Sequence, residues 1–248
     1  MRRILFAVIA VATVIAANAQ SGVSGRVTYE HVVKLDIKLE GAAAQYADLI
    51  PRERRSEKFL WFNSKATLFE NGNSVQEDIS AQTGQGNVMI RMAVPENKIY
   101  TRLSDGTQME QREFMTRLFL IDDTPERQWK LTGQQKMILD MPCQEAVMGD
   151  GDKKVTAWFT PVIPISSGPA NFGGLPGLIL MLEAGEGRQL YTAVKVEQDI
   201  AGAATISEPD KGRKVTREEF DAIVQEKMKE MGAQPGTGGR QTIIQIAR

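Results

Sequence analysis

The chain has 248 residues, with 30 lysines and arginines against 31 acidic residues and a formal net charge of −1. Hydrophobic residues make up 42% and charged residues 25%, which are the proportions of an ordinary globular protein. A charge this close to zero gives no electrostatic case for binding to nucleic acid or to an anionic membrane surface.

The chain begins with the pattern of a secretory signal peptide. Arg2 and Arg3 form a basic start, residues 4–17 are apolar, and Ala17-Asn18-Ala19 supplies the small residues of a cleavage site. The apolar run is too short for a comfortable membrane span. We therefore predict that residues 1–19 are removed on export, that no transmembrane segment remains, and that the protein acts in the periplasm or at the outer membrane.

Apolar and polar side chains alternate directly after this segment. Gly25–Leu39 has a period of 2, which predicts a strand of an antiparallel sheet with one face in water. His31, the only histidine, lies on the apolar side, where a buried histidine is expected and a ligand or general base is the alternative. Ser56–Glu70 is also strand-like. Asn71-Gly72-Asn73 is typical of a hairpin turn, and the polar segment Gln76–Asn87 is interpreted as a loop.

Short strands continue through the middle of the chain, separated by turn signals such as Asp105-Gly106. The predicted strands are Val88–Val94, Lys98–Leu103, Trp129–Leu131, Lys136–Met141, Val155–Thr160 and Gln189–Gln198. Cys143 is the only cysteine, so no intramolecular disulfide can form, and its apolar neighbours indicate that it is buried.

The most distinctive stretch is Ala157–Leu182. Prolines and glycines alternate with apolar residues between Pro161 and Gly177, which excludes a helix or a central strand there. We expect a rigid loop, followed by a buried strand at Leu178–Leu182. A loop of this length forms either a stiff corner of the fold or the lip of a pocket, and the sequence leaves both interpretations open.

This stretch also carries a family resemblance. Residues 174–179 read Gly-Leu-Pro-Gly-Leu-Ile, the motif of the GLPGLI family, which comprises exported proteins found mostly in Bacteroidetes. Trp158-Phe159-Thr160, Ile163-Pro164 and Pro142-Cys143 are similar to that family as well. The resemblance covers most of the chain after residue 19. It implies an exported protein without a settled activity, so it identifies no catalytic residues.

One helix is predicted, at Val215–Met231. Thr216 and Glu219 have the spacing of a capping box, and Gly232 ends the helix. Residues 232–248 are interpreted as a Gly/Pro linker and tail. The predicted fold is therefore mainly β: a single domain over residues 20–231 with an antiparallel curved sheet, open barrel or sandwich, and one C-terminal helix packed against it.

No catalytic constellation marks the chain, since it has no G-x-S-x-G elbow, no phosphate-binding glycine loop and no cluster of zinc ligands. The leading hypothesis is a non-catalytic exported protein that binds an apolar ligand or an outer-membrane partner. It needs no cofactor and no nucleic acid. Its candidate ligand-binding residues are Trp158, Phe159, Pro164, Phe172, Gly174, Leu175, Pro176, Gly177 and Leu178.

Two alternatives stay open at this point. Methionine, cysteine and histidine are ligands for copper(I), which makes His31, Cys143 and Met141 candidate metal ligands. An envelope hydrolase is the other alternative, with acidic residues that the sequence does not identify.

Overall fold

The computed structural model describes residues 23–35, 52–73, 78–83, 86–92, 95–230 and 244–247. The predicted signal peptide and the predicted Gly/Pro linker lie outside these residues. The proposed domain boundaries therefore remain predictions.

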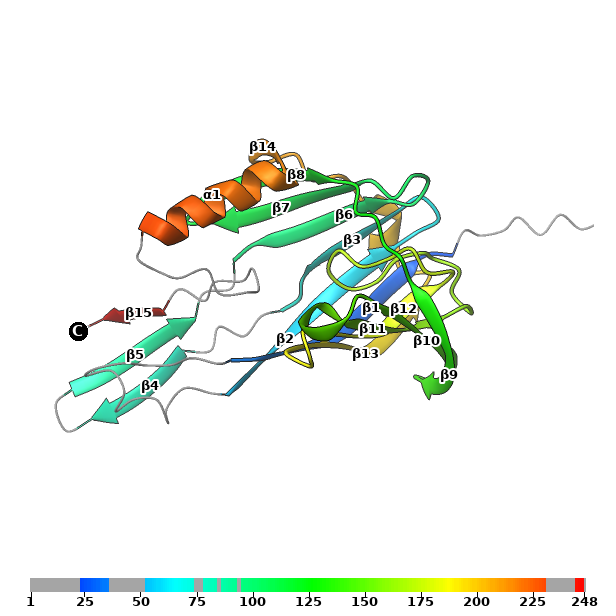
Figure 1. Ribbon diagram of the computed structural model, residues 1–248, viewed down its shortest axis with the longest axis horizontal. Helices are drawn as coiled ribbons and strands as arrows, with labels where there is room; N and C mark the ends of the chain where they lie inside the picture. Colours follow the sequence, from blue (N-terminus) through cyan, green and yellow to red (C-terminus); the bar gives the residue numbers. More distant parts are fainter. Residues whose placement is uncertain are drawn as a thin grey trace, which may run out of the picture.

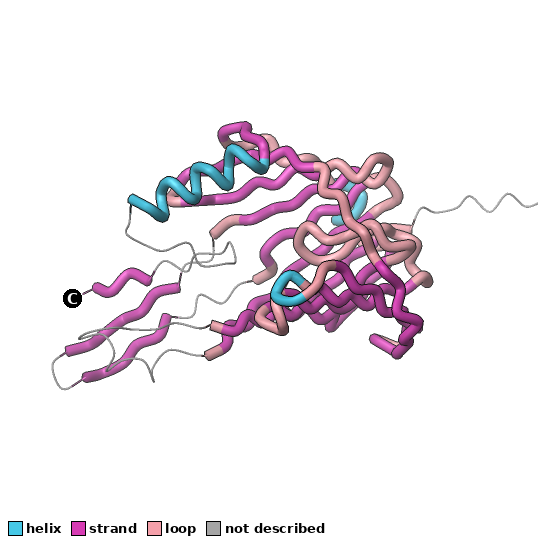
Figure 2. Tube along the Cα trace, in the orientation of Figure 1, coloured by secondary structure: helices cyan, strands magenta, loops and turns pink. Residues whose placement is uncertain are grey.

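One large sheet dominates the fold (Figures 1 and 2). Its strands are β1 (Gly25–Lys34), β2 (Glu53–Phe62), β3 (Ala66–Asn71), β6 (Asn97–Arg102), β7 (Gln108–Phe114), β8 (Arg117–Asp123), β9 (Lys130–Ile138), β10 (Met141–Met148), β11 (Val155–Thr160), β12 (Leu178–Ala184), β13 (Gln189–Gln198) and β14 (Arg213–Thr216). The twelve strands follow the order β14-β8-β7-β6-β3-β2-β1-β13-β12-β11-β10-β9. Only β14, which runs parallel to β8, departs from antiparallel pairing in this sheet.

The other elements of the described residues are a small second sheet and three helical segments. A second sheet has the order β15-β5-β4, with β4 at Asp78–Thr83, β5 at Gly86–Met92 and β15 at Ile244–Ala247. Two short 3-10 helices, η2 (Gly151–Lys153) and η3 (Ala201–Thr205), lie in connections. The α-helix, α1, spans Arg217–Glu230. The predicted mainly β fold with one C-terminal helix is confirmed, and the large sheet is open, because β14 and β9 are its two edges.

The main core lies on one face of the large sheet, where strands distant in sequence share fully buried side chains. Tyr29, Phe62, Phe159, Ile179 and Tyr191 are each at most 1% exposed. The Tyr29 hydroxyl donates to the backbone carbonyl of Ile179 at 2.5 Å, which satisfies its polar atom inside this core.

A second, smaller core lies beneath α1. Phe220 is the buried residue of the helix and packs edge-to-face against Phe119, 5.3 Å away between ring centroids. The capping box is present as predicted. The Glu219 N–H donates to the Thr216 hydroxyl at 3.2 Å, and the Thr216 N–H donates to the Glu219 carboxylate at 2.9 Å. Val215, in the adjoining strand, completes the cluster.

Two predictions in the first half of the chain are wrong. The polar segment Gln76–Asn87 is not a loop, because it contains β4, paired with β5. Asn71-Gly72-Asn73 does not close a hairpin, because β3 already pairs with β2 on one edge and β6 on the other. The Asn71 side chain instead accepts from Lys58 at 2.5 Å and donates to the Pro95 carbonyl at 2.9 Å.

Two hairpins have turns without any glycine or asparagine. Met115 and Thr116 connect β7 to β8 with φ of 50° and 62°, and Leu139 and Asp140 connect β9 to β10 with φ of 50° and 59°. Both pairs have positive φ at both positions, which is the left-handed geometry of a type I′ hairpin turn. The cross-strand pairing selects the turn here, against the local preference of the residues.

Within the described ranges, no helix has the length and apolar character needed to cross a bilayer.

Candidate functional site

The Pro/Gly stretch leaves β11 and returns to β12 through residues 161–177. Ile163, Ile165 and Leu175 are at most 4% exposed and anchor it in the main core. The N–H of Leu178 donates to the Ile163 carbonyl at 3.1 Å, and the N–H of Ile179 donates to the Ser167 carbonyl at 3.0 Å. The loop is therefore rigid, as its composition predicted.

The loop reaches strands well away from its own. The Ser167 hydroxyl lies 2.9 Å from the Thr67 hydroxyl in β3, and both residues are buried. Strands β2, β1 and β13 separate β3 from β12 in the sheet, so residues 161–177 cross the interior of the curved sheet. This crossing requires close backbone contact. A Cβ at Gly177 would stand 2.2 Å from the Thr160 carbonyl oxygen, and one at Gly168 would stand 2.6 Å from the Cβ of Ile179.

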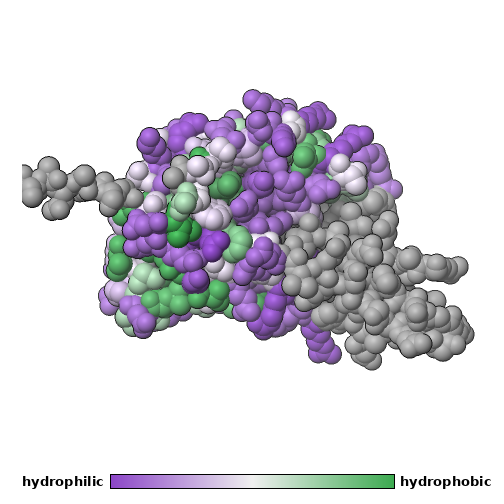
Figure 3. Space-filling model, turned by 180° about the vertical axis from the view of Figure 1, so that it is seen from behind, coloured by the Kyte–Doolittle hydropathy of each residue, from purple (hydrophilic) through white to green (hydrophobic). Residues whose placement is uncertain are grey.

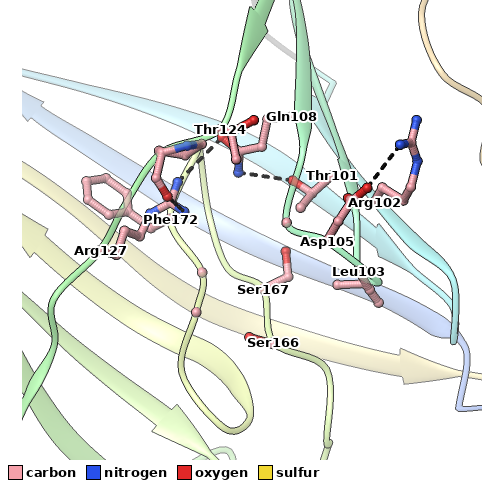
Figure 4. A pocket seen from close by; sticks show the side chains of 14 residues that line it. Thr101, Arg102, Leu103, Asp105, Gln108, Thr124, Arg127, Ser166, Ser167 and Phe172 are labelled. Atoms are coloured by element: carbon pink, nitrogen blue, oxygen red, sulfur yellow. Dashed lines mark hydrogen bonds and ion pairs between the residues drawn. The ribbon is translucent and has the colours of Figure 1, made fainter.

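A pocket of about 260 Å³ opens beside this loop (Figure 4). Three segments line it: residues 101–108 at the turn between β6 and β7, residues 124–127 before β9, and residues 166–174 of the loop. The side chains that characterise it are those of Thr101, Asp105, Gln108, Arg127, Ser167 and Phe172. The loop is thus both a corner of the fold and the lip of a pocket.

The side chain of Gln108 is held in one orientation in the wall of the pocket. It is 3% exposed, and its side-chain N–H₂ donates to the Thr101 hydroxyl and to the Asn171 carbonyl, each at 3.1 Å. Its amide oxygen therefore faces the other way, and it accepts from the Arg127 guanidinium at 3.4 Å. This orientation follows from the hydrogen-bond partners, since the amide nitrogen has both of its protons engaged.

The two arginines of the pocket differ in their surroundings. Arg102 contacts the carboxylates of Asp105 at 3.2 Å and Glu208 at 3.5 Å. The pKa of Asp105 is lowered, chiefly by the backbone N–H of Thr107 and also by Arg102, so this acid is ionised and matched. The positive charge of Arg102 is therefore already matched by carboxylates of the protein.

Arg127 is half-buried, and burial lowers its pKa, partly offset by the more distant Asp123. Among the residues that the structure describes, no carboxylate lies within ion-pair distance of the Arg127 guanidinium. Its second contact is a donation to the Pro125 carbonyl at 3.4 Å. Among the described residues, Arg127 is thus the lining cation without a carboxylate partner, and hydroxyl, amide and aromatic groups also line the pocket.

The residues predicted to bind a ligand do not gather at one place. Phe172 and Gly174 line the pocket. Phe159, Leu175 and Leu178 are buried in the main core, and Gly177 packs against the backbone of Thr160. Pro164 and Pro176 are exposed. Trp158 lies half-buried on β11, with the Lys136 ammonium 4.0 Å from its ring centroid.

The three candidate metal ligands are spread across the sheet. His31 lies in β1, 2% exposed, and stacks on Tyr191 with ring centroids 4.0 Å apart. Cys143 lies in β10, with strands β13, β12 and β11 between it and β1. Its thiol contacts Met141 only through a donation to the backbone carbonyl at 3.5 Å. In the part of the chain open to description, no three histidine, cysteine or acidic side chains are placed to hold a metal ion.

Sequence reasoning missed Arg127, Gln108 and Thr101 as pocket residues. Arg127 is one of 30 basic residues and has no distinctive neighbour in the sequence. Ser166 and Ser167 lie inside the Pro/Gly stretch, and two hydroxyls in an otherwise apolar loop were the one available signal. Only the fold shows which distant segments meet them.

The comparison with protein families concerns the loop region. A family described as "Protein of unknown function (Porph_ging)" matches residues 148–181. This range holds β11 and the whole Pro/Gly loop. This part of the chain is therefore similar to an uncharacterised family. The GLPGLI name, which the motif predicted, stays a prediction.

Solved structures of PNGF-II in the P21 and C2 space groups resemble 82% of this chain, with TM-scores of 0.55 and 0.54. Sequence identity is 13% and 12%, so the likeness concerns the fold alone. The chain spans 33% of the length of either PNGF-II chain. No curated protein matches the chain.

Proposed function

We propose that this chain is an exported, non-catalytic binding protein and that its ligand occupies the pocket beside residues 166–174. One observation carries the proposal. Three segments far apart in the sequence converge on a rigid loop to form a pocket with fixed polar groups. No histidine or cysteine belongs to the described lining of that pocket, and the buried Ser167 hydroxyl is engaged with Thr67. A nucleophile with its general base is therefore not the chemistry that the site favours.

The character of the lining refines the ligand that the sequence suggested. Phe172 and Leu103 provide apolar surface, but Gln108 and Arg127 also line the pocket. A wholly apolar ligand would cover these polar groups without pairing them, which costs free energy. We therefore favour a ligand with an apolar part and a polar end over the wholly apolar ligand expected from sequence.

Export and family membership belong to the same proposal. The basic, apolar and small-residue pattern of residues 1–19 supports a periplasmic or outer-membrane location. The sequence at residues 174–179 supports assignment to the GLPGLI family. The copper and hydrolase alternatives stay predictions without a described cluster of side chains in their favour.

A second candidate function is docking to a partner protein of the envelope. Met137, Val162, Leu131 and Leu139 are exposed by 63%, 56%, 54% and 40%. Figure 3 shows the molecule from behind, so the end with β9 and β10, at the right of Figure 1, lies at the left. Hydrophobic residues gather at the lower left of Figure 3, at this end of the molecule. Exposed apolar patches often mark interaction sites. Strand β9 is an edge of the large sheet, and the backbone of an edge strand can pair with a strand of another protein. This position favours a protein partner.

Native mass spectrometry of mature protein from an envelope fraction tests the pocket. We expect a small-molecule adduct that is lost on Phe172→Ala, which removes the aromatic wall, and retained on Val194→Ala, an exposed control position on β13. An adduct that survives Phe172→Ala, or no adduct in the native protein, would count against the pocket as a ligand site. Co-purification of a stoichiometric protein partner would favour the second candidate instead.

A further inference from the structure

We propose that the pocket binds a carboxylate group and that Arg127 is the residue that holds it. This inference rests on the proposed function, because it names the chemical class of the ligand for the same pocket. Two cations line the pocket, Arg102 and Arg127. Arg102 is matched by Asp105 and Glu208, so the charge available to a ligand is that of Arg127.

The hydrogen bonding of Arg127 leaves donors for a ligand. A guanidinium has five N–H donors, and the two contacts of Arg127, to Gln108 and to Pro125, are both 3.4 Å long. Contacts of that length are longer than a usual N–H···O hydrogen bond and therefore weak. The planar guanidinium matches two carboxylate oxygens at once, which is the geometry of the strongest charge-assisted pairs.

Gln108 keeps its amide oxygen turned toward the guanidinium of Arg127. Its nitrogen is fixed by Thr101 and Asn171, so its oxygen is committed to Arg127 and cannot rotate away without breaking two bonds. Burial lowers the pKa of Arg127, and the desolvated charge would be stabilised by an anion. Gln108 therefore acts as a positioning residue, and Arg127 makes the contact.

The two sides of the pocket are electrostatically different (Figure 4). Arg127, Thr124 and Phe172 lie on one side, and Arg102 and Asp105 lie on the opposite side. Asp105 would repel an anion that approached it, so the carboxylate is expected beside Arg127 and Thr124. A volume of about 260 Å³ suits a small acid or the last residue of a peptide. Both sources offer the same group.

Isothermal titration of the mature chain separates the ligand chemistries. The probes are N-acetylalanine, its neutral amide, a blocked tetrapeptide with a free C-terminus, and inorganic phosphate. We expect N-acetylalanine to bind at least about tenfold more tightly than its amide and than phosphate, because only the carboxylate pairs with Arg127 in a planar, bidentate manner. A tetrapeptide that binds more tightly than N-acetylalanine identifies a peptide terminus as the ligand, and equal affinity identifies a small free acid.

Variants locate the contact. Arg127→Gln is expected to weaken N-acetylalanine by about tenfold or more, and Arg127→Lys, which keeps the charge but loses the fork, by less. Arg117→Gln is the matched control, because Arg117 is an exposed arginine on β8 outside the pocket lining. Melting temperatures of all three variants check that they fold, and Arg127→Lys keeps the test valid if Arg127→Gln does not.

The results distinguish this inference from the proposal beneath it. Equal affinity for acid and amide, tighter binding of phosphate, or unchanged binding by Arg127→Gln would overturn the carboxylate inference. If a neutral ligand binds and Phe172→Ala removes it, the inference fails while the binding function stands. If no probe binds and the native protein carries no adduct, both fail.

Discussion

Trp129 donates its indole N–H to the backbone carbonyl of Gly173 at 2.8 Å. The bond joins the segment that enters β9 to the tip of the Pro/Gly loop, 44 residues later in the chain. Arg127 precedes Trp129 by two residues, so the same segment supplies both the cation of the pocket and the anchor of its lip. Gly174, directly after the bonded carbonyl, has φ of +83° and turns the loop back toward β12.

Trp129→Phe tests this anchor. Phenylalanine keeps an aromatic ring but has no donor, so the Gly173 carbonyl loses its partner, and we expect a destabilisation of about 1 kcal/mol. Chemical denaturation measures it. Binding of N-acetylalanine should weaken as well, because the loop lines the pocket. Trp158→Phe is the control for ligand affinity, since Trp158 lies on β11 outside the pocket lining. Unchanged stability and affinity of Trp129→Phe would contradict the anchoring role.

Gly177→Ala should be the more severe of two glycine substitutions. An added Cβ would stand 2.2 Å from the Thr160 carbonyl oxygen, so the loop and β11 must separate, at a cost of about 2 kcal/mol or more. Gly106→Ala meets no atom within 4 Å and carries only the strain of φ at +74°, about 1 kcal/mol. Thermal unfolding of both variants compares them. Equal losses would show that the contact at Thr160 relaxes freely.

Glu110 links α1 to the large sheet. It is 2% exposed, and its carboxylate contacts Arg217 of the helix at 2.6 Å and Arg112 at 2.5 Å. Glu110→Gln leaves these arginines without their shared anion, and we expect a loss of about 3 kcal/mol in the free energy of unfolding.

The matched control for this pair is Glu230→Gln. Glu230 pairs with Lys227 on the exposed end of the same helix, and its loss should cost less than about 0.5 kcal/mol. Urea denaturation followed by circular dichroism gives both values. A change at Glu110 no larger than that at Glu230 would mean that the buried contacts contribute nothing net.

Cys143 should react slowly with thiol reagents in the folded protein. It is 1% exposed, and burial raises the pKa of its thiol, opposed in part by Lys136. A raised pKa leaves less thiolate at pH 8 than an ordinary cysteine has, and only the thiolate attacks a disulfide reagent. We expect one thiol to react rapidly in 6 M guanidinium and to be protected in buffer. Rapid labelling of the native chain would contradict this burial.

Local patterns predicted much of the sheet and the helix. Val155–Thr160 and Gln189–Gln198 are strands with the predicted bounds, and the Thr216–Glu219 capping box starts α1. Alternation and capping are properties of neighbouring residues, so they can be read without knowing the fold. The hairpin turn at Met115–Thr116 could not be predicted in this way, because pairing of β7 with β8 imposes a backbone geometry that neither residue favours.

The sequence by itself determined that residues 161–177 form a rigid loop, because proline and glycine restrict or release the backbone wherever they occur. Only the tertiary structure decided what that loop does. Its hydrogen-bond partners, Thr67, Gln108 and Trp129, lie on three other segments, and nothing in their own neighbourhoods marks them as contacts of the loop. Composition fixes the stiffness of a segment locally. A pocket depends on which distant segments the sheet order brings together, and that order is set by the packing of the whole core.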